Sequence, residues 1–239
     1  YIVFSLEHYE KIIPNFSTYE EYITCRFPDV LARRKLAQAT LDFIYDKDKM
    51  AGLFGEEVKI NFKKVIMSGH SLGAATPVEV SLFDKRLTGG ILLLDPWIDA
   101  NDQRMYTTAV DLPIMAIRTH EYEKMDFITE KVMKYMRGSN TNKNLSLSGY
   151  YIGSKHNLFT DLVFQMPREM ELFGMVDKMS QAGRYLLSQS AMTLAFMLTI
   201  KEQEIPKDTK TFKKDVMERY SSLIKDKNFY MEYVADNLE

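Results

Sequence analysis

Hydrophobic runs of strand length recur along the chain, and the stretches between them carry apolar residues at helical spacing. The runs that predict strands cover residues 1–7, 63–67, 90–95, 112–117 and 145–152. The run over residues 90–95 is continuously apolar rather than alternating, which is typical of a parallel strand covered on both faces. Because the connections are too long for hairpins, the pattern predicts βαβ units and a mostly parallel sheet flanked by helices, an α/β fold.

Helical stretches are predicted between and after these strands. Asp29 is the expected N-cap of a helix over residues 30–48. The apolar stripe expected on this helix consists of Leu31, Leu36, Ala39, Phe43 and Ile44. Further helices are predicted over residues 74–84, 121–136, 157–164, 181–201 and 210–225.

The order of the elements predicts one main domain. Residues 1–202 form the expected α/β domain, and residues 203–239 are expected to be a helical C-terminal extension. The first apolar run begins directly at Tyr1, so we expect the domain to lack its N-terminal strands in this sequence. A chain of 239 residues is long enough to bury one sizeable core.

Composition narrows the classes of function. With 46% hydrophobic and 27% charged residues, the chain has the make-up of a soluble globular protein, and a net charge of −2 argues against a nucleic-acid partner. Its most apolar segment, residues 191–200, is about half of what a bilayer requires. Cys25 is the only cysteine, so no intrachain disulfide forms, and we expect its side chain to be buried. An intracellular location is favoured, while the compartment stays open.

One short motif carries the first chemical signal. Residues 69–73 read Gly-His-Ser-Leu-Gly and fit G-x-S-x-G, the nucleophile elbow of α/β-hydrolases. The serine of such an elbow sits on a strained strand-to-helix turn, and we expect glycine at both flanking positions to remove steric clashes. An apolar strand precedes the motif and small residues follow it, as the elbow requires. We therefore predict the α/β-hydrolase fold with Ser71 as the nucleophile.

A serine hydroxyl needs a base that takes its proton, and the chain offers four histidines. His70 lies inside the elbow, and its side chain is expected to point away from the hydroxyl. His8 and His120 follow the first and fourth predicted strands. Only His156 both comes last in the order Ser, acid, His and lies after a strand, at the sheet edge where sites form. His156 is thus the predicted general base.

The acid that orients the histidine should lie between Ser71 and His156. Asp95 ends the strand that follows the elbow helix and is the favoured candidate. Glu121 and Glu123 follow the next strand, at another position suited to this role, and remain alternatives.

Of the two donors expected in an oxyanion hole, the sequence predicts one. The backbone N–H of Leu72 is one expected donor, since it follows the nucleophile. A second donor normally comes from a loop after an earlier strand. Between the first strand and Lys63 the only glycines are Gly52 and Gly55, just before the elbow strand, so we expect this loop to precede Tyr1.

These segments together resemble the platelet-activating-factor acetylhydrolase family, the secreted and type II intracellular serine phospholipases A2. The resemblance rests on residues 1–8, 68–76, 90–97, 121–122 and 153–156, and runs in order to about Met197. It implies an acid directly after the strand that follows the elbow, which supports Asp95 over Glu121. The family's upstream His-Gly segment and a counterpart of the tail after Lys201 are not found here.

The resemblance also implies an activity, the hydrolysis of short or oxidised acyl groups at the sn-2 position of phospholipids without a metal or other cofactor. Trp97 and Phe159 are the residues we expect to contact this substrate. Apolar residues 157–163 with the helical stripe over residues 186–196 are candidates for an acyl pocket or a membrane-docking face, although such stripes are usually core.

A non-catalytic alternative stays open. The absent upstream strands and the fifteen methionines are also what one expects of a hydrolase-fold subunit in a larger complex, because exposed methionines adapt to partner surfaces. Turnover of an acetyl ester by the purified chain distinguishes this interaction role from that of an enzyme.

Overall fold

A five-stranded sheet forms the centre of the computed structural model, which describes residues 2–6, 8, 15–138, 146–160, 179–202, 209–224 and 229–233. The strands run in the order β1-β2-β3-β4-β5. Their bounds are Ile66–His70, Gly90–Leu94, Ile114–Thr119, Ser146–Tyr151 and Phe229–Tyr233. Strands β1 to β4 are parallel, and β5 pairs antiparallel with β4.

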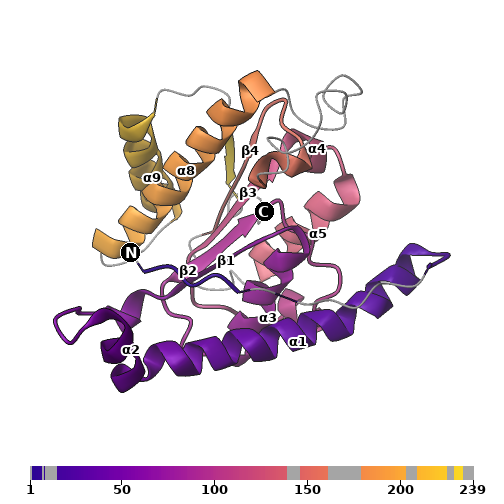
Figure 1. Ribbon diagram of the computed structural model, residues 1–239. Coiled ribbons are helices and arrows are strands. Elements are labelled where there is room, and N and C mark those ends of the chain that lie inside the picture. Colours follow the sequence, from indigo (N-terminus) through magenta and orange to yellow (C-terminus); the bar gives the residue numbers. More distant parts are fainter. Residues whose placement is uncertain are drawn as a thin grey trace.

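Helices cover both faces of this sheet (Figure 1). Helices α1 (Tyr19–Tyr45), α3 (Ala75–Phe83) and α5 (Asp126–Gly138) pack on one face, and α8 (Met179–Glu202) and α9 (Thr209–Leu223) on the other. Ile91 and Leu93 of β2 point into the first layer and Leu92 into the second, as the alternation of a strand requires. The predicted α/β fold, with a parallel sheet flanked by helices, is confirmed.

Short elements connect these layers. Helix α2 is Lys47–Phe54 and α4 is His120–Glu123. Single 3₁₀ turns are η1 (Phe62–Lys64), η2 (Ser71–Ala74), η3 (Gln103–Tyr106) and η4 (His156–Phe159). The helix predicted over residues 121–136 is therefore divided into α4 and α5. Of the helix predicted over residues 157–164, the structure describes only the 3₁₀ turn, and the part beyond residue 160 lies outside the described residues.

The N-terminal part differs from the prediction in two respects. Residues 2–6 form no strand, although their composition favours one. Helix α1 begins at Tyr19 rather than at residue 30, because Thr18 is its N-cap and forms a capping box with Glu21. Pro28 and the expected N-cap Asp29 both lie inside the helix.

The buried face of α1 also differs from the predicted stripe. Val30, Ala37 and Leu41 are its buried residues, whereas Leu36 is 42% exposed. Packing against α3 thus selects a face that the hydrophobic pattern alone did not identify. Cys25 is exposed, which corrects the expectation that its side chain is buried.

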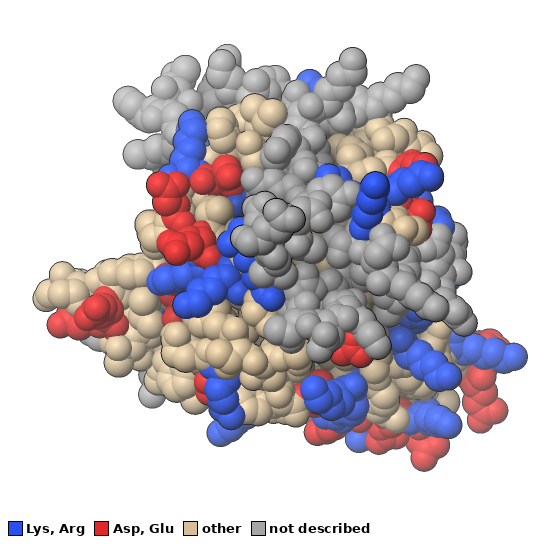
Figure 2. Space-filling view, turned by 180° about the vertical axis from the view of Figure 1, so that it is seen from behind, with Lys and Arg blue, Asp and Glu red and all other residues tan. Residues whose placement is uncertain are grey.

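The described C-terminal elements, α9 and β5, pack on the rest of the fold. Helix α9 packs on α8, with Phe196 and Phe212 in edge-to-face contact at 6.0 Å between ring centroids. Strand β5, which the pattern did not predict, extends the sheet next to β4. Within the described residues, no helix combines the length and the apolar character needed to cross a bilayer. Acidic and basic side chains are interspersed over the described surface in Figure 2, in keeping with the small net charge.

Candidate active site

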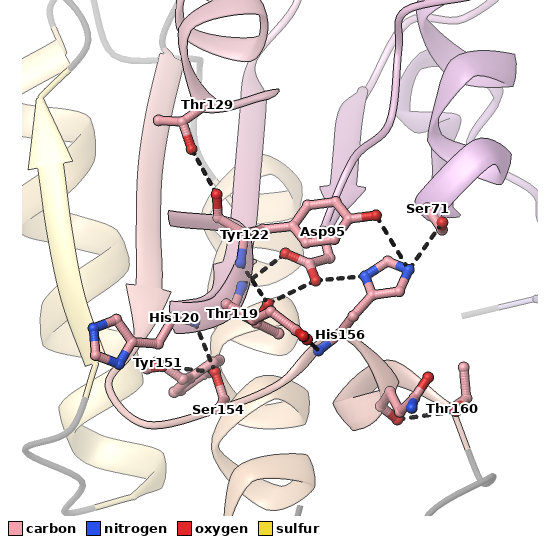
Figure 3. Close-up of polar contacts among 12 residues, drawn as sticks. Ser71, Asp95, Thr119, His120, Tyr122, Thr129, Tyr151, Ser154, His156 and Thr160 are labelled. Carbon is pink, nitrogen blue, oxygen red and sulfur yellow. Dashed lines mark hydrogen bonds and ion pairs between the residues drawn. The ribbon is translucent and has the colours of Figure 1, made fainter. Parts of the chain in front are cut away.

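Residues from several strands meet at the carboxyl edge of the parallel sheet (Figure 3). Ser71 follows β1, Asp95 follows β2, the turn over residues 119–122 ends β3, and His156 lies on the loop after β4. The carboxyl ends of parallel strands share one edge, which explains why residues distant in sequence converge there.

Ser71 occupies the tip of a sharp turn between β1 and η2. Its φ of 54° lies in the left-handed region, which non-glycine residues rarely adopt. A Cβ added at Gly69 would lie 2.2 Å from the carbonyl oxygen of Gly73, so the turn demands glycine there. A Cβ at Gly73 would meet only Arg33, at 3.8 Å, so the expectation of a clash at both positions is wrong for Gly73.

Asp95 is fully buried at the end of β2 and also has a positive φ, 44°. Its Oδ1 accepts a hydrogen bond from the N–H of Thr119 at 2.8 Å, and its Oδ2 one from the Thr119 hydroxyl at 2.7 Å. Burial raises the pKa of the Asp95 carboxyl, while these hydrogen bonds and one from His156 act in the opposite direction. The carboxylate is thus held in one orientation.

His156 lies between the other two side chains. Its Nδ1 is 2.7 Å from Oδ2 of Asp95, and its Nε2 is 3.0 Å from Oγ of Ser71. A carboxylate accepts hydrogen bonds, so Nδ1 carries the proton and Nε2 presents its lone pair to the serine hydroxyl. The structure therefore brings together the three residues predicted as nucleophile, base and acid.

Glu121, the alternative acid, contacts the same histidine elsewhere. Its Oε2 accepts the backbone N–H of His156 at 2.7 Å and does not face the imidazole. Glu123 forms an ion pair with the buried Arg118. Of the three carboxylates considered, only Asp95 is at the ring nitrogen of His156.

The loop that carries His156 is fastened to α4 by further hydrogen bonds. The N–H of Gly153 donates to Nδ1 of His120 at 3.0 Å. The N–H of His120 donates to the Ser154 hydroxyl at 3.2 Å, and the N–H of Glu121 donates to the Ser154 carbonyl at 3.1 Å. Sequence reasoning missed this fastening because it depends on the conformation of two turns.

Tyr122 lies against the imidazole of His156. Their rings are parallel within 1°, with centroids 4.3 Å apart, and the tyrosine hydroxyl is 3.3 Å from Nε2 (Figure 3). The tyrosine belongs to the Glu121-Tyr122 pair that carried part of the resemblance, but no pattern in the sequence indicated its contact with the histidine.

His70 also packs against His156. Its ring lies 4.7 Å from that of His156 and 5.6 Å from that of Phe159, between centroids. Burial, followed by the proximity of His156, lowers the pKa of His70 to about 4. His70 is therefore neutral near pH 7 and adds no charge next to His156.

The remaining predicted residues are placed as follows. Leu72 is the second residue of η2, directly after Ser71, where backbone N–H groups of a first turn lack partners within the helix. Phe159 is half-buried next to His70. Trp97 is only 7% exposed, its indole donates to the Tyr19 hydroxyl at 2.7 Å, and its backbone N–H donates to the Ser71 carbonyl at 3.1 Å. Little of this side chain is therefore accessible to a ligand.

The donor set does not suggest a metal centre. Within the described part of the chain, no three His, Cys, Asp or Glu side chains gather as metal ligands would. The polar groups at the sheet edge instead form a chain from carboxylate to imidazole to hydroxyl, an arrangement suited to proton transfer.

Comparison with known proteins places the chain in a family. No curated protein matches it. Residues 38–217, well over half of the chain, match the family described as platelet-activating factor acetylhydrolase, isoform II. This range contains Ser71, Asp95 and His156 and extends into α9, so it also covers part of the tail for which the sequence suggested no counterpart. The chain belongs to the platelet-activating factor acetylhydrolase isoform II family.

Proposed function

We propose that the chain is a serine hydrolase that cleaves an sn-2 short or oxidised acyl ester of a phospholipid. The observation that carries this proposal is the contact of His156 with both Ser71 Oγ, at 3.0 Å, and Asp95, at 2.7 Å. Membership of an acetylhydrolase family supports the choice of substrate.

Acylation begins with the serine hydroxyl. Its oxygen attacks the carbonyl carbon of the ester while its proton passes to Nε2 of His156. Asp95 accepts the Nδ1–H bond throughout and stabilises the imidazolium that forms. The C–O bond to the lysophospholipid then breaks, and its oxygen takes the proton from Nε2. Ser71 is left as an acyl ester.

Deacylation repeats these steps with water. His156 takes a proton from water, the resulting hydroxide equivalent attacks the acyl carbon, and Nε2 returns the proton to Oγ as the serine leaves. The N–H of Leu72 is the expected donor to the oxyanion of both tetrahedral intermediates, a contribution of about 10²–10³ in rate per donor.

The acyl group is expected to lie next to Phe159. This ring is half-buried beside His70 and packs against the apolar cluster of the α8 layer. Trp97 is expected to contribute little surface, because it is almost fully buried. An apolar surface of this kind holds a short acyl chain without a charged partner.

Covalent labelling tests the proposal without knowledge of the natural substrate. A fluorophosphonate should modify the purified chain once, and mass spectrometry should locate the adduct at Ser71. Ser71→Ala should abolish labelling, whereas Ser222→Ala, which removes an exposed hydroxyl bonded to its own helix, should label like the wild type. A folded wild-type chain without any adduct would support the interaction role instead.

Substrate choice needs a second experiment. Hydrolysis of 2-acetyl and 2-palmitoyl phosphatidylcholine, presented at equal concentration, should favour the acetyl ester strongly. Equal turnover of p-nitrophenyl acetate and octanoate, with no cleavage of either phospholipid, would retain the serine hydrolase and remove the phospholipid assignment.

A further inference from the structure

Four consecutive residues, 119–122, each contact a different part of the candidate active site. Thr119 binds both oxygens of Asp95, His120 and Glu121 hold the loop of His156, and Tyr122 covers the imidazole (Figure 3). The first three have evident positioning roles. Tyr122 differs because its hydroxyl is directed at the atoms proposed to react.

The geometry of the two rings defines what the hydroxyl can do. Since the rings are parallel within 1°, the phenol oxygen cannot approach Nε2 more closely than the spacing of the two planes. The oxygen is 3.3 Å from Nε2, which is close to the spacing of about 3.5 Å that separates aromatic planes in van der Waals contact. The oxygen therefore lies over the face of His156, while the lone pair in the ring plane remains available to Ser71.

The Tyr122 hydroxyl and Oγ of Ser71 lie next to the same atom, Nε2 of His156, at 3.3 Å and 3.0 Å. Burial, followed by the negative charge of Asp95, raises the pKa of Tyr122 well above its ordinary value, while a hydrogen bond with Ser71 acts in the opposite direction. The phenol consequently keeps its proton at any pH at which the enzyme would work, so it is a permanent hydrogen-bond donor next to the serine oxygen.

We propose that Tyr122 is a further catalytic residue, whose hydroxyl donates a hydrogen bond to Ser71 Oγ during acyl transfer while its ring holds the imidazole of His156 in place. This inference rests on the proposed function, since it assigns a role in that same reaction.

The protons balance in this scheme. Oγ has two lone pairs: one attacks the carbonyl carbon and the other accepts the Tyr122 hydrogen bond. The Ser71 proton goes to Nε2 of His156 and returns to Oγ when the acyl group leaves, whereas the Tyr122 proton stays on the phenol. The hydrogen bond strengthens whenever Oγ carries negative charge, which is at its attack and at its departure.

A comparison within the chain separates this role from a structural one. The hydroxyl of Tyr45 shares its one proton between two backbone carbonyls, those of Phe62 at 2.8 Å and Arg86 at 2.7 Å, and so joins segments of the fold. Tyr122 fulfils its structural bonds through its backbone, whose N–H donates to the Thr119 hydroxyl and whose carbonyl accepts from Thr129. Its phenol oxygen instead lies next to the proposed reacting groups, His156 and Ser71.

Tyr122→Phe keeps the stacked ring and removes the hydroxyl, so it is the decisive variant. We expect the fluorophosphonate labelling rate and kcat for p-nitrophenyl acetate to fall about 10- to 100-fold, the factor for one hydrogen bond to a charged group. KM should change little. Tyr122→Leu, which also removes the ring, should lose more. The matched control, Tyr45→Phe, should lower the midpoint of thermal unfolding and leave the rate unchanged.

The outcomes distinguish a failure of the proposed function from a failure of the role of Tyr122. A wild-type chain that is not labelled overturns the proposed function and this inference with it. A wild-type chain labelled at Ser71, with Tyr122→Phe labelled at the same rate, overturns the role of Tyr122 alone. If Tyr122→Phe does not fold, proton NMR of the wild type decides: the stacked phenol must shift the carbon-bound ring protons of His156 upfield, and unshifted signals would refute the arrangement.

Discussion

At the residue scale, the candidate nucleophile depends on backbone strain and on the space next to it. Ser71 has a φ of 54°, and Asp95, which supports the histidine, has one of 44°. Such conformations cost about 1–3 kcal/mol each and persist only where the surroundings impose them. At Ser71 the surroundings are the close approach of Gly69 to the Gly73 carbonyl and the hydrogen bond from Trp97 to the Ser71 carbonyl.

Substitution at Gly69 should therefore be far more damaging than at Gly73. In Gly69→Ala the new methyl meets a backbone oxygen at 2.2 Å, which only movement of the turn can relieve. We expect a loss of about 3 kcal/mol or more in the free energy of unfolding, the scale of severe overpacking, together with the loss of Ser71 labelling. Urea unfolding and labelling measure the two effects.

Gly73→Ala is the matched control for stability, because its methyl has only the Arg33 side chain within 4 Å. Its free energy of unfolding should stay within about 0.5 kcal/mol of the wild type. Equal destabilisation by the two substitutions would contradict the steric account of the turn.

The same scale shows what a sequence can reveal about a site. Ser71, Asp95 and His156 could be proposed because their order and their places after strands follow from how parallel sheets are built. Thr119 and Tyr122 could not, since their contacts depend on the path of one short turn. The exposure of Cys25 was also missed, because it depends on which face of α1 packs inward.

At the scale of elements, one buried ion pair joins α1 to α3. Glu79 of α3 has no exposed side-chain surface, and its Oε1 accepts from Arg34 of α1 at 3.0 Å. Its Oε2 accepts from the side-chain amide of Asn101 at 3.2 Å and from the N–H of Asp102 at 3.3 Å. This network fixes α1 on α3 and on the loop over residues 101–102.

Removing the cation should leave a charge buried without its partner. Arg34→Met is expected to lower the free energy of unfolding by about 3 kcal/mol. Glu79→Gln in that background should recover part of the loss, because the amide can still bond to Asn101. Lys214→Met, at a pair 71% and 66% exposed, should have an effect below about 0.5 kcal/mol. Additive losses for Arg34 and Glu79 in a double-mutant cycle would exclude direct coupling.

Element boundaries were the weakest part of the sequence prediction. Strand β2 was predicted to within one residue, because an apolar run bounded by glycine and Asp-Pro has clear limits. The start of α1 was misplaced because Asp29 was expected to be its N-cap, whereas the N-cap is Thr18, eleven residues earlier, which forms a capping box with Glu21.

At the scale of the whole molecule, the C-terminal elements complete the second layer and one edge of the sheet. Helices α8 and α9 cover the face formed by Leu92, Met115 and Leu147, and β5 pairs with β4. Strand β5 escaped prediction because five residues without a distinct boundary give too little pattern. Its place in the sheet follows from its antiparallel pairing with β4, which the sequence pattern does not reveal.

Deleting residues 225–239 should expose the edge of β4. An unpaired strand edge is a template for pairing with another chain. We expect the shortened chain to unfold at lower temperature and to self-associate, as measured by calorimetry and size-exclusion chromatography. A shortened chain that stays monomeric with an unchanged unfolding temperature would show that β5 does not protect this edge.

The turn over residues 119–122 has a consequence for how the site tolerates motion. Because Asp95, the histidine loop and the imidazole are all attached to this one turn, we expect a displacement of the turn to carry them along as a group. The backbone of Ser71 is held from another side, by β1 and by the N–H of Trp97. We therefore expect small displacements of the turn to change mainly the distance between the serine oxygen and Nε2.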